Sequence, residues 1–138
     1  MPIKTTWKDI GAPEASALLS PAFVTTSNTP LVYTSGCVGT DPKTGRLPED
    51  LEQQTRNAIE NLRIVLSKSG CSSLDQVVKV LLFVADGKYA PVVNKVYKEY
   101  FTNQPCRSCV VVGFPNEKIK VELECVAEVD KKTRWFKL

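Results

Sequence analysis

The sequence predicts an α+β fold in which two helices cover one face of a mixed β-sheet. Three observations lead to this fold class. Strand-like segments precede and follow two segments with helical spacing, and residues 77–85 are almost entirely apolar. In residues 118–125, apolar residues and Cys125 alternate with charged residues. At 138 residues the chain is long enough for one domain, which we expect to span residues 1–138.

The first half of the chain predicts a strand, a turn and a helix. Residues 31–35 (LVYTS) are rich in β-formers, and residues 40–45 (TDPKTG) are typical of a turn. The helix is expected to begin at residues 48–50, with acidic residues in its first turn, and to end at Gly70. Its apolar positions follow helical spacing: Leu51, Thr55, Ala58, Leu62 and Leu66.

The second half predicts a central strand, a helix and two further strands. Residues 77–85 (VVKVLLFVA) are too short and too β-branched for a helix. Residues 88–101 have Tyr89, Val93, Val96 and Tyr100 at helical spacing. Residues 105–125 contain two strands, and we expect them to form a hairpin around residues 115–116.

The apolar strands also predict self-association. Two helices cover only one face of the sheet, yet residues 77–85 and 110–112 are apolar on both faces. An exposed face of this kind would form a larger apolar patch than a monomer usually tolerates. We therefore expect another copy of the chain to cover it.

Composition excludes several function classes. The chain has 43% apolar and 24% charged residues and a net charge of +3, and no window approaches a membrane span. It contains no histidine, which excludes Ser-His-Asp triads, Cys-His dyads and zinc sites with histidine. The basic residues are scattered apart from a short cluster at 131–134, so nucleic acid is not an expected partner. The first twenty residues fit neither a secretory signal nor a transit peptide, and we expect a cytoplasmic protein with free thiols.

The segment Cys106-Arg107-Ser108-Cys109 admits three interpretations: a redox pair, half of a metal site, or an arginine site. In a strand the two cysteines point to opposite faces, which disfavours the first two. A hairpin would bring Cys109 beside Glu122 and Arg107 beside Glu124. The arginine then forms either a cross-strand ion pair, worth at most ~1 kcal/mol, or a functional site. The pattern alone leaves this choice open.

Three stretches resemble the YjgF/RidA family of reactive-intermediate (enamine/imine) deaminases. They are residues 32–62 (VYTSGCVGTDPKTGRLPEDLEQQTRNAIENL), residues 77–101, and RSCV at 107–110, which is followed by Glu122 within KVELECVA. The resemblance covers nearly the whole chain. It implies a chorismate-mutase-like fold assembled as a homotrimer with clefts at the subunit interfaces.

The family resemblance also implies an activity. Members hydrolyse small 2-imino or 2-aminoacrylic acids to 2-oxo acids and ammonia, without metal or cofactor. By position, Arg107 would grip the substrate carboxylate. Glu122 would hold and help deprotonate the attacking water or shuttle protons to the nitrogen. Ser35 and the backbone carbonyl of Cys109 would complete the pocket, although Ser35 also suits a turn before Gly36.

The chain departs from the family near its N-terminus. Many members have Gly-Pro-Tyr, whose tyrosine from one chain reaches the pocket, whereas this chain has Ser20-Pro21-Ala22-Phe23. Phe23 would make the pocket more apolar at this position. The alternative function is therefore a trimeric module without catalysis that binds a small acid or a protein, in a translation-related or chaperone-like role.

Overall fold

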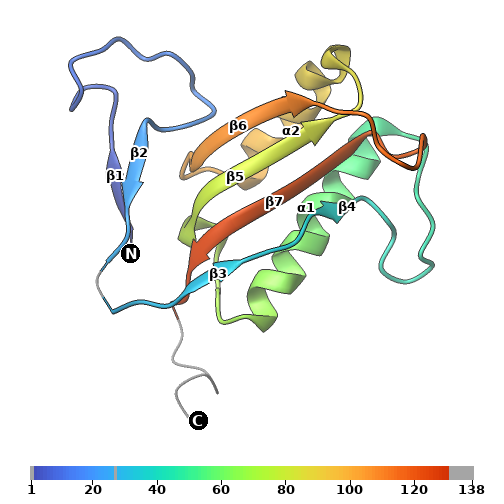
Figure 1. Cartoon of the computed structure of the whole chain (residues 1–138), viewed down its shortest axis with the longest axis horizontal. Helices are drawn as coiled ribbons and strands as arrows, with labels where there is room; N and C mark the ends of the chain where they lie inside the picture. The colour runs from blue at the N-terminus through green and yellow to red at the C-terminus, as the bar shows by residue number, and fades with distance from the viewer. Residues whose placement is uncertain (1, 27, 131–138) are drawn as a thin grey trace.

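The computed structural model describes residues 2–26 and 28–130; the basic cluster at 131–134 lies outside them. Figure 1 shows a small sheet beside a larger sheet, with the helices behind the larger one. The helices and strands, in chain order, are β1 (Ile3–Thr5), β2 (Ala22–Val24), β3 (Leu31–Tyr33), β4 (Cys37–Val38), α1 (Leu51–Lys68), β5 (Val77–Val84), α2 (Ala90–Tyr100), β6 (Cys106–Val111) and β7 (Val121–Glu128), with short 3₁₀ helices at Leu74–Gln76 and Gly87–Tyr89.

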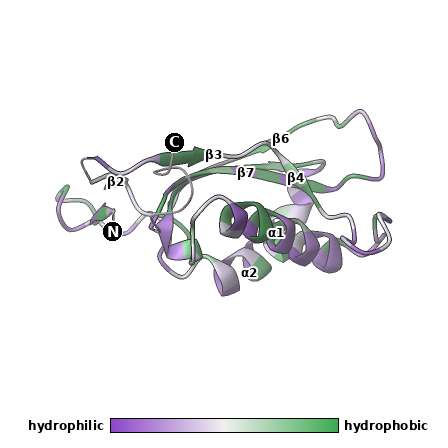
Figure 2. Cartoon of the chain, turned by 90° about the horizontal axis from the view of Figure 1, so that it is seen from below, coloured by the Kyte–Doolittle hydropathy of each residue, from purple (hydrophilic) through white to green (hydrophobic). Residues whose placement is uncertain are grey.

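The large sheet is mixed, as predicted. Its strand order is β3-β7-β5-β6, and β4 continues along the same edge of β7 as β3. Among the described strands of this sheet, β5 and β6 pair in parallel and the other pairs are antiparallel. Both helices lie on one face of this sheet (Figure 2), so the predicted α+β class and helix placement are confirmed.

Local sequence signals determine where α1 begins and ends. The Asp50 carboxylate caps the first turn by accepting a hydrogen bond from the Gln53 N–H at 2.8 Å. After the helix, Gly70 has a φ of 98°, a left-handed conformation that glycine adopts without strain. The predicted ends are therefore confirmed to within about two residues.

The core lies between the helices and the sheet. Side chains from α1, α2, β5 and β7 meet there, and the alternation predicted for residues 119–125 directs one row of β7 inward. The buried members include Ala58, Ile59, Leu62, Val80, Leu82, Val93, Val96, Val121 and Leu123. Neither helix of the described chain has the length and apolar character required to cross a membrane.

The last two strands do not form the expected hairpin. β6 pairs with one edge of β5 and β7 with the other, so β5 lies between them. The prediction that Cys109 lies beside Glu122, and Arg107 beside Glu124, is therefore wrong. Because β5 is almost entirely apolar, pairing on both of its edges buries more of its surface than an edge position would.

A buried glutamine holds the connection between these strands. Gln54 of α1 is fully buried and donates to the Lys118 carbonyl at 2.9 Å, while its Oε1 accepts from the Lys120 N–H at 3.0 Å. These bonds fix the start of β7 against α1. The segment that connects β6 to β7 therefore passes the end of β5 before β7 begins.

Candidate functional site

Arg107 lies on β6, at the edge of the large sheet. It is in register with Val80, whose side chain is fully buried under the helices, so Arg107 points toward the helix-covered face. Its Nη1 donates to Asn94 Oδ1 of α2 at 2.8 Å, and its Cζ lies 4.8 Å from the centre of the Tyr97 ring. Nε is buried and has no hydrogen-bond partner among the described residues. Two sides of the guanidinium are thus held, and Nη2 and the second Nη1 hydrogen remain to receive a ligand.

Tyr97 forms an apolar floor under this arginine. Its side chain is buried and stacks on Phe101 with ring centres 4.4 Å apart. Burial raises the pKa of the Tyr97 hydroxyl, and the nearby Arg107 charge partly opposes this rise. The residue therefore stays neutral and supports the guanidinium through its ring.

Sequence reasoning missed both Asn94 and Tyr97 as partners of Arg107. The pattern assigned Tyr89, Val93, Val96 and Tyr100 to the inner face of this helix. Asn94 is a polar residue directly beside that apolar row. This position was the one feature of the sequence that could have indicated a contact between Asn94 and the sheet. Its role depends on where β6 pairs, which helical spacing does not reveal.

Cys109 is two residues beyond Arg107 on the same side of the strand, and its thiol is free and exposed. Cys106 is in register with Lys79 and Cys109 with Leu82, so the two cysteines point to opposite faces, as predicted. No group of three or more potential metal ligands occurs in residues 2–26 and 28–130.

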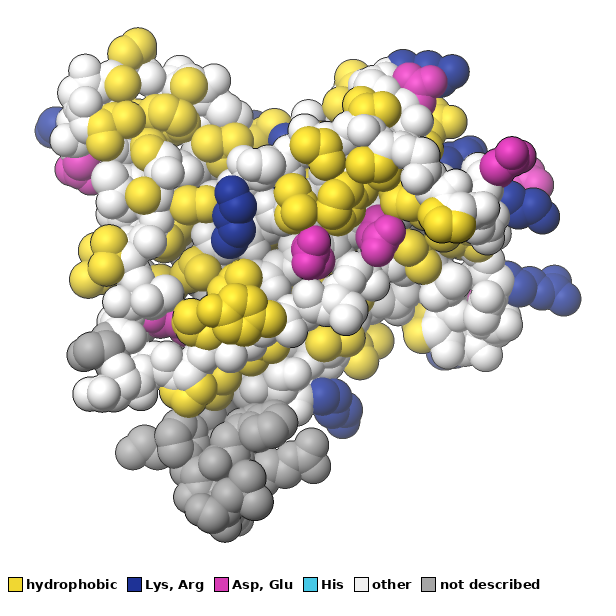
Figure 3. Space-filling view, in the orientation of Figure 1, with side chains coloured by type: hydrophobic (Ala, Val, Ile, Leu, Met, Phe, Trp, Pro, Cys, Tyr) yellow, Lys and Arg dark blue, Asp and Glu magenta, His cyan; other side chains and the backbone are white. Residues whose placement is uncertain are grey.

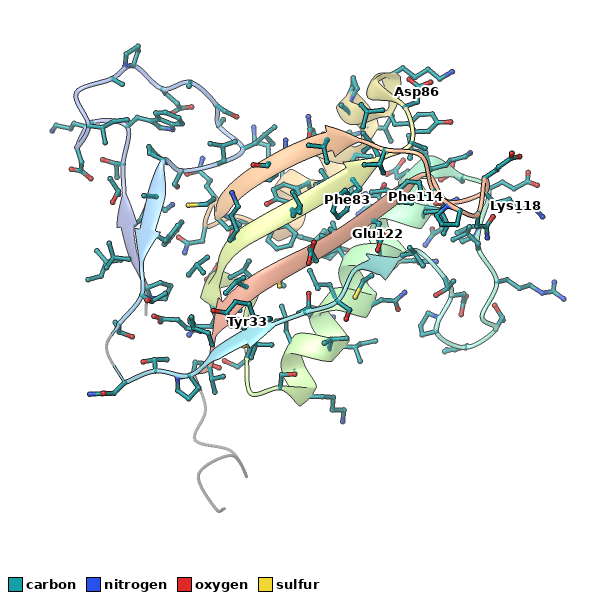
Figure 4. All side chains as sticks on the ribbon, viewed as in Figure 1. Tyr33, Phe83, Asp86, Phe114, Lys118 and Glu122 are labelled. Carbon is teal, nitrogen blue, oxygen red and sulfur yellow. The ribbon has the colours of Figure 1, made fainter. Side chains whose placement is uncertain are left out.

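Glu122 lies on the opposite face of the sheet, which no helix covers. It is in register with Phe83 of β5 (Figure 4). Its carboxylate lies against Gly36: a β-carbon built on Gly36 would overlap a carboxylate oxygen and lie 2.7 Å from the carboxyl carbon. Burial raises the pKa of the Cys37 thiol, and the Glu122 charge raises it further. Ser35 is exposed and directly precedes Gly36, so it belongs to the same part of the surface.

One chain does not bring Arg107 and Glu122 together. Their register partners on β5, Val80 and Phe83, are three residues apart, which corresponds to roughly 10 Å along a strand and to opposite faces. The sheet itself therefore lies between the Arg107 guanidinium and the Glu122 carboxylate.

Phe23 lies on a different sheet from the other candidate residues. It belongs to β2, which pairs with β1, and the Lys4 ammonium lies 5.7 Å from the centre of its ring. These two strands were not predicted from the sequence, because each is only three residues long.

The fold and these side chains define a small α+β domain with a helix-supported arginine at one sheet edge and a carboxylate on the open face. The model of the endoribonuclease L-PSP family matches residues 10–129, and the chain belongs to this family, which is the YjgF/RidA family suggested by the sequence motifs.

Relatives of the chain carry names of two kinds. The 2-iminobutanoate/2-iminopropanoate deaminase of Salmonella typhimurium is 34% identical over 124 residues, which cover 87% of this chain and 96% of the relative. The crystal structure of Escherichia coli TdcF with bound serine has a TM-score of 0.67 at 29% identity, covering 91% of this chain and 97% of that chain. An Entamoeba histolytica structure with the endoribonuclease L-PSP name has a TM-score of 0.67 at 37% identity, covering 85% of this chain and 92% of that chain.

Proposed function

We propose that this protein is a hydrolase of reactive 2-imino and enamine acids, of the 2-aminoacrylate and 2-iminobutanoate type. The products are 2-oxo acids and ammonia, and the reaction uses no metal or cofactor. The observation that carries the proposal is the geometry of Arg107. With one side bound to Asn94 and one face on Tyr97, its tip presents two parallel donors, which suits a planar carboxylate.

The proposed active unit is a homotrimer with clefts at the subunit interfaces. Arg107 and Glu122 of one chain point to opposite faces, so a cleft that contains both must combine two copies. The open apolar face gives the copies a surface through which to associate. We infer that Arg107 of one copy meets Glu122 of the next.

In this cleft Glu122 holds the attacking water and accepts its proton. Contact with Gly36 limits the positions open to the carboxylate, and Ser35 lines the adjoining wall. Cys109 orients the water through its backbone carbonyl, so its thiol does not react. Phe23 contributes an apolar surface to the substrate pocket.

The chemistry requires only position, water and a route for protons. An enamine first takes a proton at its terminal carbon and loses one from its nitrogen to water, which gives an imine. Water then adds to the C=N carbon, Glu122 takes the water proton, and Glu122 passes this proton to the nitrogen. The C–N bond of this carbinolamine breaks as the C=O bond forms, and Glu122 carries the hydroxyl proton to the departing nitrogen, which releases ammonia and leaves the 2-oxo acid bound at Arg107.

The test couples a threonine or serine dehydratase to the purified protein and follows the absorbance of the imine. We expect the imine to decay faster in proportion to the amount of protein added, with many turnovers per chain. A decay rate that is unchanged across both substrates would reject the deaminase proposal. It would favour the second candidate, a trimeric module that binds a small acid or a protein. The observation behind this candidate is that neither Ala22 nor Phe23 has the hydroxyl of the family's tyrosine.

A further inference from the structure

The open face of the large sheet carries charges among its apolar side chains. In Figure 3 hydrophobic side chains gather over the sheet, with basic and acidic side chains among them. The strand registers assign Lys79, Glu122 and Glu124 to this face. Its apolar members, half-buried or exposed, are Leu31, Tyr33, Leu81, Phe83, Val110 and Val126.

Two of these charges have no partner in residues 2–26 and 28–130. None of the ion pairs or side-chain hydrogen bonds of the described residues involves Lys79 or Glu124. Leu81 lies directly opposite Glu124 in the β5–β7 register, so Lys79 and Glu124 are diagonal neighbours that do not pair. Both line one groove of about 240 Å³, together with Tyr33 and Leu81.

A surface that covers this face must supply a partner for each charge, because an unpaired charge is costly to bury. The chain itself offers the matching surface, since each copy presents one lysine and one glutamate of opposite sign. Glu122 is a poorer partner because its carboxylate is confined against Gly36. In a closed ring, the lysine of each copy can meet the glutamate of the next.

We propose that Lys79 of one copy pairs with Glu124 of the neighbouring copy and that these pairs fix how the copies fit together. This inference rests on the homotrimer of the proposed function and adds the residues that set its register. It gives the two charges a structural role separate from the chemistry at Arg107 and Glu122.

The experiment exchanges the charges one at a time and then together. Lys79→Glu and Glu124→Lys should each weaken trimer assembly by roughly a hundredfold or more, measured by light scattering and native mass spectrometry over a dilution series. The double variant should assemble like the wild type. Lys43→Glu, an exposed change of the same charge in the 40–45 turn, should assemble normally.

Mixing the two single variants separates pairing between copies from pairing within a copy. If the pair joins two copies, equal amounts of the two variants should form more trimer than either variant alone, because two of the three interfaces of each mixed trimer again join opposite charges and only the third joins like charges. If the double variant assembles but the mixture forms no more trimer than either single variant, the pair lies within one chain and the inference is wrong. Circular dichroism verifies that each variant is folded. If a charge-reversed variant does not fold, Lys79→Gln or Glu124→Gln replaces it, with a smaller loss of trimer assembly expected.

Two further results would also overturn the inference. One of them rejects the proposed trimer as well, and the other rejects only the Lys79–Glu124 pair. A wild-type protein that is monomeric at micromolar concentration removes the trimer of the proposed function as well. A trimeric wild type whose single variants assemble equally well rejects the Lys79–Glu124 pair alone.

Discussion

Replacing Arg107 with lysine tests whether the guanidinium binds the substrate carboxylate. The structure gives the arginine one bond to Asn94, at 2.8 Å, and leaves its tip free for two parallel bonds to a carboxylate. A lysine keeps the positive charge, but its compact ammonium cannot present both donors in one plane while it also reaches Asn94. At least one charge-assisted bond to the substrate is therefore lost.

The loss of one such bond costs about 1.5–3 kcal/mol, which corresponds to roughly a ten- to hundredfold decrease in kcat/KM for the imino acid. The coupled dehydratase assay measures this ratio. Folding should change little, with a decrease in Tm of no more than about 4 °C for a chain of this size. Arg63→Lys is the matched control, because Arg63 is exposed and pairs with Glu60 on the outer surface of α1.

The opposite result has a clear meaning. If Tm falls but kcat/KM per folded trimer stays at the wild-type value, Arg107 supports the packing of β6 on α2 and does not bind the carboxylate. The proposed site would then be wrong.

Three further changes test the other parts of the site and the core. Glu122→Gln should preserve the trimer and the binding of a 2-oxo acid but lower kcat by about 10²–10⁴-fold; a loss below tenfold would point to another base. Gly36→Ala should displace the Glu122 carboxylate and lower kcat at least about tenfold with little change in Tm, because the flexible end of the glutamate side chain can move aside; a wild-type kcat would show that the position of this carboxylate against Gly36 does not matter. Burial raises the pKa of Cys71 to about 11 and of Cys125 to about 12, from an ordinary 9.0, so these thiols stay neutral in the folded protein at pH values that ionise them after unfolding. Chemical denaturation should show stability that is constant between about pH 7 and 8.5 and falls above pH ~9, by about 1.4 kcal/mol per thiol per pH unit up to the folded pKa. Cys125→Ala should reduce this slope, and an unchanged slope would contradict the assignment.

The parts of the fold that depend on local sequence were predictable. Asp50 and Gly70 delimit α1 because a carboxylate cap and a left-handed glycine act within one helical turn. The inward row of β7 follows from strict alternation, and the opposite orientation of Cys106 and Cys109 follows from strand geometry. The family motif located the candidate arginine and glutamate.

The pairing of strands was not predictable in the same way. Strands that are consecutive in sequence often pair, which favoured a hairpin between β6 and β7. The structure instead pairs both with β5, because this strand has the most apolar surface to bury. Asn94 became a partner of Arg107 only through this tertiary arrangement, so helical spacing could not have revealed it.

The same strand order explains why the proposed activity depends on assembly. β5 lies between β6 and β7, and the register directs Arg107 toward the helices and Glu122 toward the open face. No rotation of either side chain brings the two groups together across the packed sheet, since the core residues between them are fully buried. In the proposed trimer, a second copy brings its own open face to the β6 edge of the first. If this proposal is correct, a substitution that only prevents assembly should abolish deamination while every site residue stays intact, because the open apolar face and the site at the sheet edge then belong to one catalytic arrangement.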